Sequence, residues 1–361
     1  MNRIDTQDKT SPKPYAMTLR SGGAATRTWA SAQLLKQGAL APLRRAMRGT
    51  TDEVIGWIRS RLRRVLLGVA LVSLLSGCAV RQALSNRVDD AITGNGEVYA
   101  TDPDVELVGA ASPFGLKLIE SLLAESPQHR GLLLAAARGF TQYAYAYVET
   151  PADELEEHNV AGAYAARERA RKLYLRARDY GLRGLNAAYP GFSADVRQSA
   201  GTTLRRMHRE DVPLLYWTAV SWGAAISLSK DDAAMLGELP AVRQLADRAL
   251  ELDEAYDGGA IHILQITLAI TEPRPQVERI ALAERHFDRA VELSRGQQAA
   301  PFVSYAEAVS VGTGERAQFE QLLDRALAID ATATPSWRLS NEIFQRRARW
   351  LRSRTDEMFS Q

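Results

Sequence analysis

The sequence predicts an all-α protein: irregular helix-pair repeats that form one helical domain, behind a flexible, unstructured N-terminal leader. From residue 114 onward, apolar residues recur at helical spacing, and no sustained alternating run rich in Val, Ile and Thr predicts a strand. Nine prolines from Pro127 to Pro335 punctuate this region at intervals that suit helices and their turns. Similar segments also recur at spacings of 41 and 36 residues, which is typical of helix-pair repeats: Arg248–Asp253, Arg289–Ser294 and Arg325–Asp330.

The apolar periodicity and the breaker residues set the expected helices in order. They cover residues 115–125, 128–149, 161–188, 194–207, 213–228, 238–253, 257–271, 277–294, 302–312, 315–330 and 335–357. The acidic stretch 151–160 is expected to be a solvated loop or the start of a helix.

Small and aromatic residues alternate on one face of several of these helices, at positions i, i+4 and i+7. Alanine lets a neighbouring helix approach closely, and the ring fills the gap between turns. This pattern resembles the second helix of tetratricopeptide repeats. Two copies are clear and two are degenerate: Ala283-Phe287-Ala290, Ala170-Tyr174-Ala177, Val242-Ala246-Ala249 and Phe319-Leu323-Ala326. Because the spacing is uneven, we expect an irregular tetratricopeptide-like domain over residues 114–361.

The N-terminal part has the pattern of a secretory signal. Four arginines between residues 59 and 64 precede the twelve apolar or small residues Val65–Ser76, too few to span a bilayer. Leu75-Ser76-Gly77-Cys78 resembles the lipobox of bacterial lipoproteins, and Cys78 is the chain's only cysteine. The resemblance implies cleavage before Cys78 and its acylation. Because Ala79, not aspartate, follows, it also implies the outer membrane.

These features divide the chain into a leader over 1–77, a lipidated tether over 78–113 and the helical domain. Residues 47–77 have the ordinary size of a lipoprotein signal peptide, so we interpret residues 1–46 as a mis-called start or a disordered extension. Residues 1–77 carry thirteen Lys and Arg against four Asp and Glu, whereas the remainder carries 32 against 39. The mature body is therefore acidic, which argues against a nucleic-acid partner.

Catalytic motifs are scarce. The sequence contains no Gly-x-Ser-x-Gly elbow, P-loop, dinucleotide glycine fingerprint or His-Glu-x-x-His motif. We therefore predict a non-enzymatic protein without a cofactor or metal. His262 and His286 fall on neighbouring predicted helices, and a metal site there would take Glu284 or Asp288 as its third ligand. Packing of two histidines at a helix interface is the favoured interpretation.

Aromatic residues give the candidate binding site. Tyr216, Trp217 and Trp222 lie on a helix that is apolar on most sides, which indicates either a solid core or the wall of an apolar pocket or channel. Further candidate pocket residues are Tyr143, Tyr147 and His262. A small hydrophobic or carboxylated ligand would suit such a pocket, with nearby cations for a carboxylate from Arg205, Arg206 and Lys230.

The chain resembles the T component of tripartite ATP-independent periplasmic (TRAP) transporters, a family of tetratricopeptide-like lipoproteins. The resemblance runs from about 115 to 330. It rests on Leu215-Tyr216-Trp217, Trp222-Gly223, Ala225–Asp232, Gly259–His262, His286-Phe287 with Ala290, Phe319–Asp330, Lys172-Leu173-Tyr174 and Pro190-Gly191-Phe192. It implies a periplasmic lipoprotein that partners the solute-binding P component and assists ligand handling.

Two other functions fit the residues. One is an outer-membrane repeat lipoprotein that scaffolds envelope assembly or secretion. The other is a metal-dependent periplasmic enzyme that uses His262 and His286. Self-association into a homo-oligomer is a further expectation, because large aromatic faces on helical repeats favour it.

Overall fold

The computed structural model describes Trp57 and residues 59–64, 98–198 and 201–360. The chain divides into two units, residues 1–77 and 78–361. In the first unit, the described residues are helical and exposed, and the Arg61 guanidinium lies 4.5 Å from the centre of the Trp57 ring. Most of the predicted leader, and Cys78 with the predicted tether up to residue 97, lie outside the described residues.

The described part of the second unit is helical and contains no strand, so the all-α prediction is confirmed. The longer helices are α2 (Val105–Glu125), α3 (Arg130–Ala144), α5 (Val160–Ala188), α8 (Val212–Ser227), α10 (Leu239–Leu252), α11 (Ala260–Ile270), α12 (Gln276–Leu293), α15 (Arg316–Leu327) and α16 (Arg338–Ser353). Shorter ones are α4 (Thr150–Leu155), α6 (Phe192–Gln198), α7 (Gly201–Leu204), α9 (Ala233–Leu236), α13 (Ala300–Tyr305), α14 (Val311–Thr313) and α17 (Thr355–Met358), with 3-10 turns at η2 (Arg209–Asp211), η3 (Tyr256–Gly258) and η5 (Pro335–Trp337).

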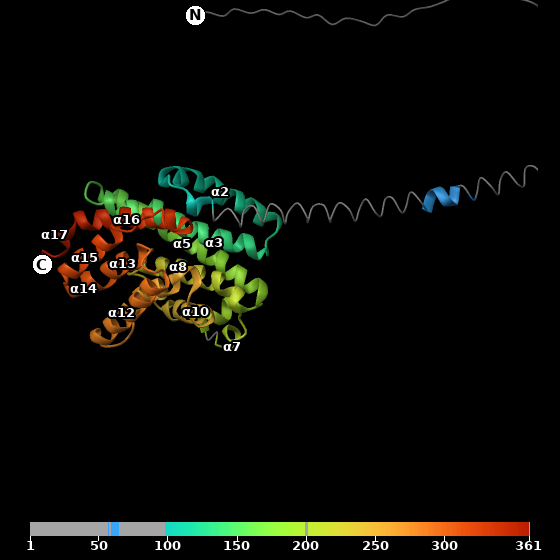
Figure 1. Ribbon diagram of the computed structural model, residues 1–361. Coiled ribbons are helices and arrows are strands. Elements are labelled where there is room, and N and C mark those ends of the chain that lie inside the picture. Colours follow the sequence, from blue (N-terminus) through green and yellow to red (C-terminus); the bar gives the residue numbers. More distant parts are fainter. Residues whose placement is uncertain (1–56, 58, 65–97, 199–200, 361) are drawn as a thin grey trace, which may run out of the picture. The chain divides into compact units, whose positions relative to one another are not determined.

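Successive long helices pack on one another. Helix α2 lies on α3, α3 on α5, α5 on α8 and α8 on α10, and the chain continues through α11, α12, α13, α15 and α16 (Figure 1). The faces that carry the small and aromatic repeat positions are buried, as predicted. Side chains that are at most 1% exposed include Ala170, Tyr174, Ala177, Val242, Ala246, Ala249, Ala283, Ala290, Phe319, Leu323 and Ala326. The repeat pattern therefore marks the core.

Helix α2 begins ten residues before the predicted start at 115. The Asp104 carboxylate caps it by accepting a hydrogen bond from the Leu107 backbone N–H at 2.8 Å. Pro113 lies inside the helix and is exposed, so the helix continues past it. The predicted tether over 78–113 is thus too long, because its last nine residues belong to α2. The prediction placed the helix start at 115, after Pro113, whereas the helix continues through this proline.

Two of the predicted long helices contain a π-helical turn. The first, η1 (Tyr145–Glu149), joins α3 to α4, and the second, η4 (Ala306–Ser310), joins α13 to α14. A π-turn inserts a residue into an α-helix and often occurs at functional sites. The acidic stretch after Pro151 continues as α4, because the proline occupies a position at the helix start that needs no N–H donor.

The last long helix returns to the first. Helix α16 contacts α2, and the Arg346 guanidinium lies 3.2 Å from the Glu106 carboxylate. Two large core clusters lie along the stack, one among α5, α6, α8 and α10 and the other among α11 to α16. Side chains from both halves of the domain therefore meet at α16.

Candidate functional site

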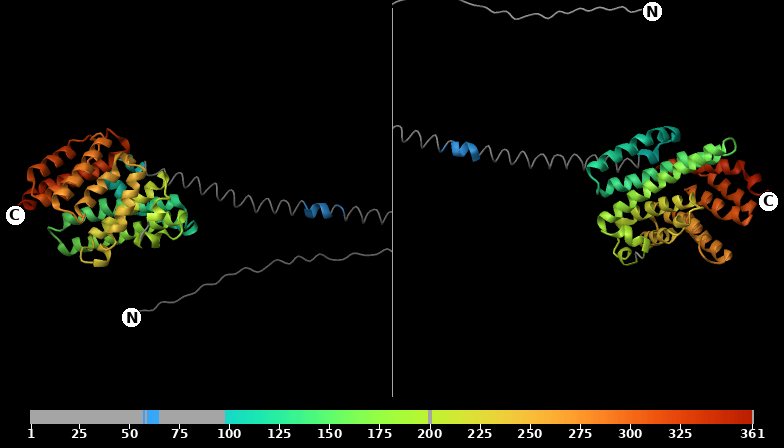
Figure 2. Two further views of the ribbon diagram at one scale, coloured as in Figure 1. Left: turned by 90° about the horizontal axis from the view of Figure 1, so that it is seen from below. Right: turned by 180° about the vertical axis from the view of Figure 1, so that it is seen from behind.

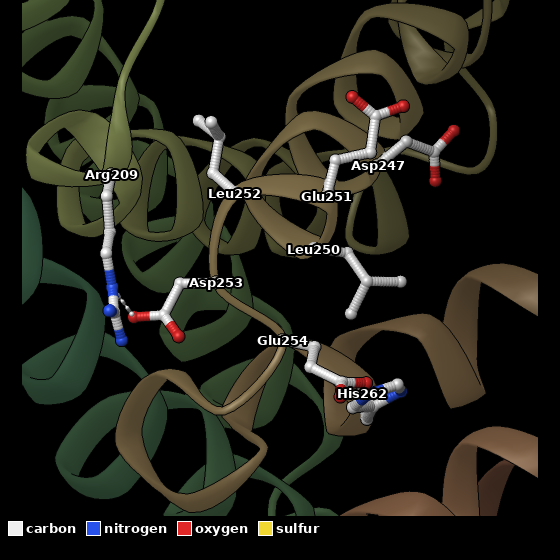
Figure 3. Close-up of a pocket in the computed structure, with 8 residues that line it drawn as sticks. All are labelled: Arg209, Asp247, Leu250, Glu251, Leu252, Asp253, Glu254 and His262. Carbon is white, nitrogen blue, oxygen red and sulfur yellow. Dashed lines mark hydrogen bonds and ion pairs between the residues drawn. The ribbon is translucent and has the colours of Figure 1, made fainter.

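A cleft of about 710 Å³ lies beside the C-terminal end of α10. It is lined by Arg209, Asp247, Leu250, Glu251, Leu252, Asp253, Glu254 and His262 (Figure 3). Its acidic side chains already have partners: Arg209 pairs with Asp253 at 2.9 Å, and Arg289 with Glu254 at 2.6 Å. Such exposed pairs contribute little to stability, and they leave few polar groups for a ligand.

His262 and His286 meet beside this cleft, as the sequence predicted. Their Nδ1 atoms are 2.9 Å apart, so one ring donates a hydrogen bond to the other. Burial lowers the pKa of both rings, that of His286 to about 4, and the two are therefore neutral at pH 7. A hydrogen bond between neutral rings fixes the orientation of both.

The third ligand that the alternative metal site would need is not in place. Glu284 and Asp288 are exposed on α12, and the carboxylate that approaches His262 Nε2, at 3.6 Å, is that of Glu254. Among the residues that the structure describes, no three His, Cys, Asp or Glu side chains form a group that could hold a metal ion. The histidine pair therefore fits a packed helix interface better than a metal centre.

The three aromatic residues of α8 do not share one pocket. Tyr216 and Trp217 are half-buried, and the Tyr216 ring lies 5.4 Å from that of Tyr256. Trp222 is 0% exposed, so it borders no space that water can enter. Its Nε1 donates to Glu238 at 2.8 Å, and the guanidiniums of Arg178 and Arg197 lie within 5.4 Å of the ring centre. Trp222 is thus a core residue.

The other predicted site residues are also separate from this helix. The Tyr143 and Tyr147 rings are tilted by 33° with their centres 5.7 Å apart, and the Tyr147 hydroxyl donates to the Val105 carbonyl at 3.0 Å. They anchor α2, because a Cβ at Gly109 would lie 2.6 Å from the Tyr147 ring. The cations proposed for a carboxylate are exposed and form no shared site: Arg205, Arg206 and Lys230.

A cluster of charged and phenolic side chains lies where the two π-turns meet α16, and the sequence analysis missed it. We call it the polar centre, and it comprises Tyr145, Glu149, Asp153, Tyr174, Glu307 and Arg347. The Tyr174 hydroxyl donates to the Glu149 carboxylate. Arg347 donates to Glu307 at 2.7 Å and pairs with Asp153 at 2.8 Å. Elements far apart in the sequence, η1, α4, α5, η4 and α16, thus supply one site.

The polar centre is recessed but reachable by solvent. The side chain of Glu307 is 30% exposed and that of Arg347 is 12% exposed. Burial raises the pKa of the Glu149 carboxyl to about 6, although the hydrogen bond from Tyr174 opposes this shift. Burial also raises the pKa of Glu307, against the attraction of Arg347. Near neutral pH, Glu149 can therefore donate or accept a proton in a bond to a polar group.

Two sequence signals mark this cluster in retrospect. Tyr145, Glu149 and Asp153 are spaced four residues apart, which places polar groups along one stripe of a helical segment. Glu307 is the single charged residue between Ala299 and Gly314, in an otherwise apolar stretch. A lone acid in an apolar helix indicates a buried partner, and here that partner is Arg347.

The raised pKa of Glu149 predicts a pH dependence. The native state binds the proton more tightly than the unfolded chain does, so this carboxyl stabilises the fold below about pH 4.5, and the effect is lost as the pH rises through 6. We expect Glu149→Gln to gain stability relative to the parent protein, by about 2 kcal/mol between pH 4.5 and 7. Urea unfolding over this pH range measures the difference.

A matched control for this pH dependence is Glu168→Gln. Arg171 lowers the pKa of Glu168 to about 2, so the stabilising effect of this carboxylate is present above pH 4.5 and is lost toward pH 2. Its substitution should therefore cost stability, and no gain should develop between pH 4.5 and 7. If the difference in free energy of unfolding between Glu149→Gln and the parent did not change over this pH range, the pKa of Glu149 would not be raised in the native state.

Stacked helical hairpins define a class of folds, the helical-repeat proteins. The family model described as the TRAP transporter T-component matches residues 101–359, and the chain belongs to this family. It is also 34% identical over 266 residues to an uncharacterized protein of Treponema pallidum (strain Nichols), a match that covers 73% of this chain and 82% of that protein. Family membership gives it an accessory role in a TRAP transporter and a periplasmic or membrane-associated location.

Proposed function

We propose that this chain is a periplasmic lipoprotein, anchored through Cys78, that binds the solute-binding P component of its TRAP transporter and assists ligand handling. The family match supports this most strongly, because it runs from Thr101 to Phe359 and so covers the described helical domain almost completely. The whole stack of hairpins, and not a fragment of it, is related to the T component.

The lipid anchor is supported by the sequence before the domain. Leu75-Ser76-Gly77-Cys78 provides the acylation signal, and the chain divides into its two units between Gly77 and Cys78. Several acyl chains on one cysteine hold a protein stably on a membrane. Ala79 favours the outer membrane as the place of attachment. Mass spectrometry of the mature N-terminal peptide tests the modification directly.

The polar centre is our candidate for ligand handling. Its carboxylates exceed its nearby cations, and Glu149 changes its protonation near pH 6, so the site suits the polar end of a ligand better than an apolar chain. Tyr216 remains a candidate for a separate apolar contact at the cleft, since it packs in the same core cluster as Leu250 and Leu252, and the Trp217 ring lies 5.0 Å from that of Tyr216. Trp222 is fully buried and therefore takes no part in ligand binding in this proposal.

The partner proposal is tested by direct binding. Purified mature protein is titrated with each TRAP solute-binding protein of the same organism, and sedimentation velocity reports complex formation. We expect one of them to form a complex with a micromolar or lower dissociation constant, and solute-binding proteins of other transporter types serve as controls. If no TRAP solute-binding protein binds more tightly than these controls at 100-fold higher concentration, the proposed partnership is wrong.

A further inference from the structure

Helix α2 has apolar side chains on two opposite faces. At 100° per residue, Leu107, Phe114 and Leu118 fall within about 40° of one another and form what we call the outer stripe. Leu116 and Leu123 point about 160–180° away from Leu107, and they are buried. An ordinary surface helix has one apolar face, so the second face of α2 needs an explanation.

The inner face fixes α2 to the domain. A Cβ at Gly139 of α3 would lie 2.8 Å from Leu116, which shows how closely the two helices pack. Glu120 accepts a hydrogen bond from Tyr180 at 2.7 Å. Among the described helices, α2 alone has the length and hydropathy of a membrane span, but these contacts hold it on the surface of the domain. In Figure 1 and the right-hand view of Figure 2 it lies at the edge.

The outer stripe contains large side chains that are open to solvent. Phe114 is 76% exposed, Leu107 58% and Leu118 42%. Three such residues on one face, over about 16 Å of helix, form a contiguous apolar strip. The charged residues Glu106 and Lys117 lie to one side of the strip and carry opposite charges, and Glu125 falls in line with the strip about 10 Å beyond Leu118. Between Leu107 and Leu118 the face is therefore apolar and close to neutral, which suits a lipid interface more than a charged partner.

The position of α2 in the chain indicates what covers this strip. Twenty residues separate Cys78 from Val98, where the described helical part begins, and an extended chain of this length reaches at most about 70 Å. A lipid on Cys78 would thus keep α2, the first long helix after the anchor, near the bilayer. We propose that the outer stripe of α2 lies on the membrane surface and orients the domain there. This inference rests on the proposed lipid anchor.

The test separates the strip from the anchor. The mature protein from residue 78 is prepared with Cys78→Ser, which cannot be acylated, and is mixed with vesicles of phosphatidylethanolamine and phosphatidylcholine in a flotation assay. We expect it to float with the vesicles. The triple variant Leu107→Ser, Phe114→Ser, Leu118→Ser should show at least a tenfold lower partition coefficient, and because all three positions are exposed its thermal melt should match that of the parent.

Val277→Ser provides the matched control. Val277 is 78% exposed on α12, which lies on the opposite side of the domain from α2 in Figure 1. The partition coefficient of the Val277→Ser variant should therefore equal that of the parent. Failure of the non-acylated parent to float, or equal flotation of the triple variant, would overturn the proposal. The proposal would also be overturned if, without lipid, the triple variant sedimented with a lower mass than the parent. Such a result would mean that a second copy of the chain covers the strip in the parent.

The same variants distinguish this inference from the proposed function. Titration of the triple variant with the P component should give the affinity of the parent, and a loss there would assign the strip to the protein partner instead of the lipid. Mass spectrometry of the wild-type N-terminal peptide reports acylation independently. A chain that is acylated and binds the P component, but whose strip does not contact vesicles, would refute the membrane-facing role alone.

Discussion

Replacing Trp222 with alanine is expected to lower the free energy of unfolding by about 3–5 kcal/mol. The indole is completely buried, has the guanidiniums of Arg178 and Arg197 within 5.4 Å of its ring centre, and donates its Nε1–H to Glu238 at 2.8 Å. Truncation leaves a cavity and removes one of the hydrogen-bond donors of Glu238, whose carboxylate still accepts from Arg197 at 3.1 Å and from Arg178 at 3.4 Å. Urea unfolding followed by far-ultraviolet circular dichroism measures the loss.

Two variants separate the contributions to this effect. Trp222→Phe keeps most of the ring and removes the donor, so it should cost less than Trp222→Ala. Trp217→Ala alters a half-buried ring on the same helix and should also cost less. If Trp222→Ala folded with parental stability, the residue could not be a core residue, and a role for it in a pocket would return.

Arg347→Ala is the second substitution with a large expected effect. It removes the guanidinium that pairs with Glu307 at 2.7 Å and with Asp153 at 2.8 Å inside the polar centre. The recessed Glu307 carboxylate would then lack a cation, whereas Asp153 keeps its pair with Arg167 at 2.7 Å. Breaking a buried pair by removing one partner costs about 3–5 kcal/mol. The loss should be largest at neutral pH and smaller near pH 4.5, where protonation of Glu307 removes part of the repulsion.

The neighbouring residue is a matched control for this substitution. Arg346 is 48% exposed and pairs with Glu106 and Glu154 at the surface. Arg346→Ala should therefore change the free energy of unfolding by about 0–1 kcal/mol. Thermal unfolding of both variants at pH 7 and pH 4.5 makes the comparison, and equal losses for Arg346→Ala and Arg347→Ala would contradict a special role for the polar centre.

The fold was predictable because the sequence pattern that specifies each helix lies within that helix. Small and aromatic residues repeat at helical spacing, and the structure buries nearly all of them, as Ala170, Tyr174 and Ala177 illustrate. Helix boundaries were less predictable where proline was involved. Pro113 lies inside α2, whereas the sequence pattern treated it as the end of a tether, because the exposed side of a helix tolerates a missing N–H more readily than a simple breaker rule allows.

The candidate site was less predictable because its residues come from distant parts of the sequence. Glu149 and Arg347 are nearly 200 residues apart, and although the spacing of Tyr145, Glu149 and Asp153 marks a polar stripe, it does not indicate that Arg347 joins it. The π-turn at Tyr145–Glu149 also shifts the helical phase, so the face of the following residues cannot be counted from the preceding helix. For Trp222, the periodicity indicated a helix that is apolar on most sides, but only the positions of Arg178 and Glu238 decide which ring is fully enclosed.

The contact between Arg346 on α16 and Glu106 on α2 makes this domain unlike an open solenoid. In an open array the terminal repeats each have a free end, and evolution can lengthen or shorten the protein by adding or deleting units there. Here the two extremities of the array touch, so gaining or losing one hairpin would pull that junction apart. A change in the number of hairpins would therefore have to preserve or replace this contact between α16 and α2.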